Sequence, residues 1–165
     1  MKIKFVLFLF VFSFFHVSCD DNDSSRKVKF DLDEFNTNRD KWEALDLQNY
    51  SYEYSNSGYS YSGISSNISI QIINGEEAEV IALVENGIQD ADQYLIDDLF
   101  EQIFSRFPTD GSADVSNSTY LKEIKVVYDE NYNFPSEVHY LYYIPEDMLG
   151  IWNMHQYIEK FEVEE

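Results

Sequence analysis

Basic side chains are scarce in this chain of 165 residues, which carries 11 lysines and arginines against 31 aspartates and glutamates. The formal net charge is −20, whereas binding to nucleic acid or to anionic lipid requires clusters of Lys and Arg. We therefore expect no nucleic-acid partner. The chain is also too rich in aromatic residues, with 13 Tyr and 13 Phe, to be a solvated, disordered polypeptide.

Long apolar runs are lacking as well. The longest, residues 5–15, is interrupted only by Ser13 and is shorter than the roughly 20 residues that span a bilayer. Lys2 and Lys4 precede this run, and small or polar residues follow it, which is the pattern of a removable secretory signal. We therefore predict a signal peptide of the lipoprotein type over residues 1–18.

Cysteine occurs once, at Cys19, so the chain cannot form an internal disulfide. The sequence Val17-Ser18-Cys19 resembles the end of a bacterial lipobox, in which the cysteine is acylated and becomes the new amino terminus. Two or three acyl chains on one residue would hold it firmly in a membrane. His16 departs from this pattern, which prefers leucine three residues before the cysteine. We predict lipidation of Cys19; the alternative is ordinary cleavage nearby and a soluble periplasmic protein.

Residues 19–32 are acidic and polar and lack an apolar period, which indicates a flexible tether. The acids within residues 20–23 resemble the surface-export signal of some bacterial lipoproteins, but an aspartate directly after the cysteine marks inner-membrane retention in other bacteria. We expect an exported protein that is anchored in the outer membrane through Cys19. Whether it faces the periplasm or the cell surface stays open.

The hydrophobic periodicity predicts a single α+β domain over residues 33–165. Helices are predicted over residues 33–46, with Phe35, Trp42 and Leu45 on one face, and over residues 93–107. Strands are predicted over residues 50–54, 68–72, 77–84, 121–128, 136–143 and 157–163, with a turn at 56–58, further pairing at 59–61 and a hairpin turn at Asn74-Gly75. The order α-β-β-β-α-β-β-β predicts an antiparallel sheet of about six strands with both helices packed on one face.

Motifs of known catalytic chemistry are absent, because the sequence contains no HExxH, GxSxG or GxxxxGK[ST]. Two histidines follow the signal segment, His139 and His155, and we expect His139 at the surface of a strand. The acidic segments at residues 90–92, 110–114 and 129–131 lack the ligand spacing of an EF-hand and predict solvated loops, with calcium binding left open. We predict no catalytic residue, no metal site and no cofactor.

Tyrosine is the compositional oddity, and it gathers at alternating positions of the first strand region. Five of these side chains form a candidate exposed aromatic face for a protein or a glycan: Tyr50, Tyr52, Tyr54, Tyr59 and Tyr61. The competing interpretation is that they pack in the core and against neighbouring strands.

Three segments together resemble a known family: NRDKW at residues 38–42 with NYSYEY at 49–54, IDDLF at 96–100, and VYD at 127–129 with NFPSEV at 133–138. The chain is similar in these segments to the DUF6174 family of small bacterial secreted proteins and lipoproteins of unknown function. The resemblance covers about residues 35–163 and implies no activity and no catalytic residues. Many members carry cysteines near the first hairpin, which this chain lacks.

The leading hypothesis is a membrane-anchored lipoprotein of the bacterial envelope whose domain is a non-enzymatic binding module for a protein or a glycan. A periplasmic inhibitor or assembly factor is an alternative. A hydrolase with a dispersed active site is a further one.

Overall fold

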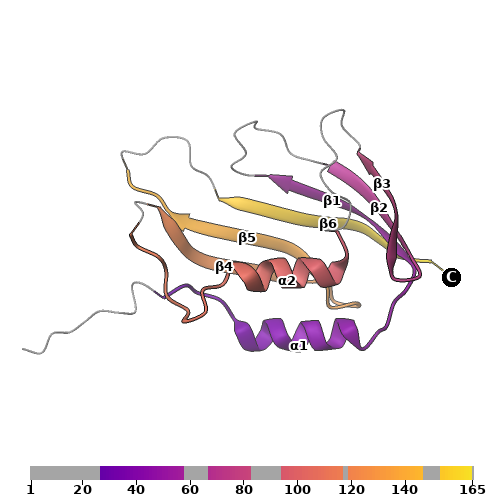
Figure 1. Cartoon of the computed structure of the whole chain (residues 1–165), viewed down its shortest axis with the longest axis horizontal. Helices are drawn as coiled ribbons and strands as arrows, with labels where there is room; N and C mark the ends of the chain where they lie inside the picture. Colours follow the sequence, from indigo (N-terminus) through magenta and orange to yellow (C-terminus); the bar gives the residue numbers. More distant parts are fainter. Residues whose placement is uncertain (1–26, 58–66, 83–93, 117–118, 147–152, 165) are drawn as a thin grey trace, which may run out of the picture.

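The computed structural model describes residues 27–57, 67–82, 94–116, 119–146 and 153–164. These residues form a six-stranded antiparallel sheet and two helices (Figure 1). In chain order the elements are α1 (Leu32–Glu43), β1 (Tyr50–Ser57), β2 (Asn67–Ile73), β3 (Glu76–Ala82), α2 (Ile96–Arg106), β4 (Tyr120–Tyr128), β5 (Pro135–Tyr143) and β6 (Met154–Val163). The predicted α+β class and the order α-β-β-β-α-β-β-β are confirmed.

The strands lie in the order β3-β2-β1-β6-β5-β4, so the last strand of the chain is inserted at the centre of the sheet. There β6 pairs with β1 from Tyr50↔Val163 to Ser57↔His155 and with β5 from Glu137↔Tyr157 to Tyr140↔Met154. It thereby joins the two three-stranded halves that the sequence pattern indicates.

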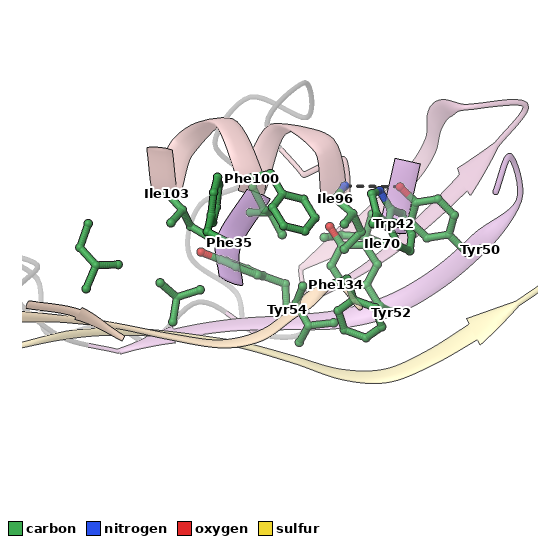
Figure 2. Close-up of a cluster of buried hydrophobic side chains, with 14 of the residues drawn as sticks. Phe35, Trp42, Tyr50, Tyr52, Tyr54, Ile70, Ile96, Phe100, Ile103 and Phe134 are labelled. Carbon is green, nitrogen blue, oxygen red and sulfur yellow. Dashed lines mark hydrogen bonds between the residues drawn. The ribbon is translucent and has the colours of Figure 1, made fainter. Parts of the chain in front are cut away.

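The core lies between the helices and one face of the sheet (Figure 2). Alternation along each strand sends every second side chain to this face, where it meets the apolar stripes of the helices. The buried apolar side chains are Phe35 and Trp42 of α1, Ile96, Leu99, Phe100 and Ile103 of α2, Tyr50, Tyr52 and Tyr54 of β1, Ile68, Ile70 and Ile72 of β2, Ile124 of β4, Val138 and Tyr140 of β5, Ile158 of β6, and Val28 and Phe134 outside these elements.

Two local predictions are wrong. The first helix ends at Glu43 rather than at residue 46, and Leu45 is 40% exposed. After Glu43 the backbone hydrogen bonds span three residues instead of four, from Leu45 N to Trp42 O and from Asp46 N to Glu43 O. This tighter turn directs Leu45 away from the core. The predicted turn at 56–58 is also wrong at its first two residues, because Asn56 and Ser57 pair with β6. Residues 59–61 and Val84 lie outside the described residues.

The last part of the predicted tether belongs to the fold. Val28 is 6% exposed, and Lys29 exchanges backbone hydrogen bonds with β4, from Lys29 N to Lys122 O (3.0 Å) and from Ile124 N to Lys29 O (2.9 Å). The ring of Phe30 packs against Phe35 and Phe107. Residues 27–30 therefore cover the edge of β4 around Glu123, and that part of the edge cannot pair with another chain.

The hairpin between β2 and β3 turns through Asn74 and Gly75, whose φ angles are 55° and 75°. Both residues are in the left-handed region, as a two-residue type I′ turn requires. The turn is held from outside by Asn74 N to Asn49 Oδ1 and by Gly75 N to Gln48 O, each 2.9 Å.

We expect Gly75→Ala to lower the free energy of unfolding by about 1–2 kcal/mol, because an L residue with a Cβ resists positive φ. The added Cβ would also lie 2.8 Å from Gln48 Oε1, although that side chain can swing away. Urea unfolding followed by circular dichroism measures the loss. Gly75→Asn is the control and should cost less, since Asn tolerates this conformation; equal losses for both variants would contradict the explanation.

Candidate functional site

The predicted exposed aromatic face is wrong at the three tyrosines that the structure describes. Tyr50, Tyr52 and Tyr54 are 2%, 1% and 4% exposed. They lie on the helix-facing side of β1, which is an inner strand, so α1 and α2 cover them (Figure 2). The packing interpretation therefore holds for these three residues. Tyr59 and Tyr61 lie outside the described residues.

The hydroxyl groups of these buried tyrosines have partners in the core. Tyr50 Oη accepts a hydrogen bond from Ile96 N at 3.4 Å (Figure 2), and Tyr52 Oη donates to the carbonyl of Tyr94. Tyr54 Oη accepts from Gln156 Nε2 at 2.9 Å. Burial raises the pKa of Tyr54, so this hydroxyl stays protonated at neutral pH and serves the fold.

The opposite side of the sheet is covered by neither α1 nor α2, and it carries two neighbouring rows of side chains. The register aligns Ser57, His155, His139 and Lys125 across β1, β6, β5 and β4 in one row. The next row, in the same strand order, is Ser55, Tyr157, Glu137 and Val127. We call these eight residues, together with Leu141 of β5, the open face.

The open face mixes polar, aromatic and aliphatic side chains, most of them half-buried by their neighbours in the sheet. Val127, at its β4 end, is 38% exposed. Among these nine residues, Lys125 and Glu137 carry opposite charges. Glu123, Glu53 and Glu159 lie around them on the same side of the sheet.

At the centre of the open face His139 and His155 form a cross-strand pair. Their Nδ1 atoms are hydrogen-bonded to each other, and the ring centroids are 4.6 Å apart at an interplanar angle of 75°. Glu137 Oε2 lies 3.1 Å from His139 Nε2, and the ring of Tyr157 stacks on His155 at 6.4 Å. One Nδ1 must donate and the other accept, so only one proton can lie between the two rings.

Burial, followed by the charge of His139, lowers the pKa of His155 below its ordinary value of about 6.5. A histidine whose pKa is depressed in the folded state supports folding above the unfolded-state pKa, and that support is lost as the pH falls through the folded-state value. We therefore expect stability to decline as the pH falls below about 6.5, before most carboxylates titrate.

Proton NMR of the imidazole Cε1–H resonances across the same pH range would measure this pKa directly. The matched variant His155→Gln should show a weaker decline of stability in urea unfolding. A His155 resonance that titrates at or above the ordinary value would contradict the expectation.

A second candidate site is a cavity of about 320 Å³ between the end of α1 and the start of α2. Arg39 lies between two carboxylates there, 3.7 Å from Glu43 and 3.7 Å from Glu101. Trp42 Nε1 donates to Asp97 Oδ1 at 2.9 Å. These contacts tie the two helices together, and they indicate a structural role.

The carboxylates of the acidic loops accept hydrogen bonds from backbone N–H groups of the same loop. Asp129 Oδ1 accepts from the backbone N–H groups of Asn131 and Tyr132, both at 2.8 Å, and Asp114 Oδ1 accepts from Ser116 N at 3.0 Å. Residues 90–92 lie outside the described residues. Among the residues that are described, no three His, Cys, Asp or Glu side chains form a group that could hold a metal ion. In the same part of the chain, neither helix is long and apolar enough to cross a membrane.

The histidine pair escapes sequence reasoning because it depends on strand register. His155 precedes the predicted start of the last strand at residue 157, whereas β6 begins at Met154. The available signal was that His139 and His155 are the only histidines after the signal segment.

Comparison with known proteins identifies a family. The model of DUF6174, a family of unknown function, matches residues 34–143, from α1 to the end of β5. No curated protein and no solved structure matches the chain. The family match includes His139 but ends before β6 and therefore before His155. Because it covers well over half of the sequence, the chain belongs to the DUF6174 family.

Proposed function

We propose that this chain is a lipid-anchored protein of the bacterial cell envelope, and that its domain is a non-enzymatic module that binds a protein partner through the open face. The proposed localisation in the cell envelope is based on the sequence, namely on Lys2 and Lys4, the apolar run and the lipobox-like Val17-Ser18-Cys19. The anchor is acylated Cys19 in the outer membrane, with the domain facing the periplasm or the cell surface.

The observation that carries the binding role is the asymmetry of the sheet. Both helices cover one face, while the other presents Tyr157, Leu141 and Val127 beside a polar centre of two histidines and a carboxylate. Aromatic and aliphatic groups around a few directed polar groups are the composition of a protein-recognition surface. The cavity between the helices shares no residue with the open face, and a second cavity, beside residues 29–31, shares only Lys125 with it.

The attachment of residues 27–30 to β4 supports this proposal geometrically. The chain from Cys19 to Lys27 can reach at most about 29 Å when fully extended. An acylated Cys19 would therefore hold the β4 edge of the sheet near the membrane surface. The partner expected from this arrangement is another envelope protein, as for an inhibitor or an assembly factor.

Site-specific photo-crosslinking in intact cells tests the proposal. A photoreactive residue at position 157 or at position 141 of the open face should give one discrete crosslinked adduct. The adducts from the two positions should contain the same partner protein. The matched control is position 37, where exposed Thr37 lies on α1, and it should give no such adduct. Failure to crosslink from both open-face positions, or the same adduct from position 37, would contradict the proposal.

A further inference from the structure

The geometry points to a metal site on the open face: His139 and His155 together bind one late first-row divalent cation, such as Zn²⁺ or Cu²⁺, through their two Nδ1 atoms. The two side chains come from directly paired positions of β5 and β6, and their Nδ1 atoms already face each other. This site is independent of the proposed protein partner.

Glu137 prepares His139 for this role. Its Oε2 atom lies 3.1 Å from His139 Nε2, so it accepts the Nε2–H hydrogen bond of that ring. In the neutral imidazole the proton is then on Nε2, and the lone pair of Nδ1 is free to bind a cation. A carboxylate that holds the second nitrogen of a metal-binding histidine is the usual arrangement around such ligands.

His155 completes the site by a change of tautomer. In the metal-free pair His155 Nδ1–H donates to His139 Nδ1, which leaves the lone pair of His155 on Nε2. When the cation binds, the proton leaves His155 Nδ1 and Nε2 takes up a proton from water, so two neutral Nδ1 ligands face the metal without a net loss of protons.

The spacing suits this exchange. Metal–nitrogen distances of about 2.0–2.1 Å place the two ligand atoms roughly 3 Å apart. The two Nδ1 atoms are hydrogen-bonded to each other in the metal-free pair, and a small rotation of one ring adjusts their spacing to this value. Imidazole nitrogens favour Cu²⁺, Ni²⁺ and Zn²⁺ over Mg²⁺ and Ca²⁺, which prefer oxygen ligands.

The site has two protein ligands, since no group of three metal-binding side chains occurs among the described residues. Water fills the remaining coordination positions. The neighbouring charges are Glu137 and Lys125, and the exposed Lys125 side chain can turn towards solvent. Tyr157 flanks the pair and limits access from one side, with its ring 6.0 Å from that of His139.

The test is a titration of the full chain in detergent micelles with Zn²⁺ and, separately, Cu²⁺, after treatment with a chelator. Calorimetry should give one cation per chain, and ¹⁵N NMR with Zn²⁺ should show perturbed Nδ1 rather than Nε2 resonances of both histidines. His139→Ala and His155→Ala should each weaken binding by at least tenfold, and Glu137→Gln by about tenfold. Mg²⁺ should leave the histidine resonances unchanged.

Glu130→Gln, an exposed residue of the turn between β4 and β5, is the control and should bind as the wild type does. Circular dichroism establishes whether each variant folds. If a histidine variant fails to fold, the wild-type Nδ1 shifts still decide the question. The inference is overturned if millimolar Zn²⁺ and Cu²⁺ leave both histidines unperturbed, or if folded His139→Ala binds as tightly as the wild type.

Discussion

Trp42→Ala is expected to lower the free energy of unfolding by about 3–5 kcal/mol, the range for truncating a large aromatic residue in a packed core. Trp42 is only 4% exposed, although it lies on a helix at the edge of the domain. Its ring contacts three aromatic side chains edge-on, at centroid distances of 5.6 Å to Tyr50, 6.1 Å to Phe134 and 6.0 Å to Phe161. These partners come from β1, β6 and the turn before β5, so the indole joins α1 to three parts of the sheet.

The hydrogen bond of the indole adds a second, smaller effect. Trp42→Phe keeps an aromatic ring but removes the Nε1–H that Asp97 accepts at 2.9 Å. Asp97 is exposed, so water can replace the lost donor, and we expect a loss of only about 1–2 kcal/mol.

Urea unfolding followed by far-ultraviolet circular dichroism measures both Trp42 variants. Lys41→Ala, at the exposed neighbouring position, is the control and should change stability by less than about 0.5 kcal/mol. A Trp42→Ala loss as small as that of the control would contradict the packing described here.

Cys19→Ser is expected to abolish lipidation entirely. If the proposed anchor is correct, intact mass spectrometry of the wild-type chain should show the glyceryl group and two or three acyl chains, and Cys19→Ser should show none. Each buried methylene contributes about 0.8 kcal/mol, so two or more chains hold a protein in the membrane where a single chain binds only marginally.

Reaction with a thiol-specific maleimide distinguishes lipidated Cys19 from the alternative, a soluble periplasmic protein with a free Cys19 thiol. The lipidated wild type has no free thiol, whereas a soluble periplasmic form would have one, because Cys19 is the only cysteine. His16→Leu restores the usual lipobox residue and should be lipidated at least as completely as the wild type. Wild-type protein that reacts fully with maleimide and carries no acyl mass would contradict the anchor.

Local patterns predict the number and order of the helices and strands of this fold, although not every boundary. The alternation of Ile68, Ile70 and Ile72 predicts a strand with one buried face, and Asn74-Gly75 predicts the hairpin that follows it. Both features depend only on neighbours in the sequence, and both occur in the structure.

Features that depend on strand order could not be predicted in the same way. The insertion of β6 beside β1 supplies the partners of Asn56 and Ser57, which the sequence pattern assigns to a turn. The alternation of Tyr50, Tyr52 and Tyr54 shows that they share a face, but it does not show whether helices cover that face. The open face, including the pair His139–His155, likewise appears only once the β5–β6 register is known.

We propose that the open face is occupied by a partner in the cell, and single-cysteine labelling tests this occupancy most directly. Ser55→Cys places a thiol on the open face, and Thr37→Cys places one on the exposed side of α1. We expect Ser55→Cys to react several-fold more slowly with a small maleimide in intact cells than in the purified chain, and Thr37→Cys to react at the same rate in both. Equal rates for Ser55→Cys in cells and in the purified chain would contradict it.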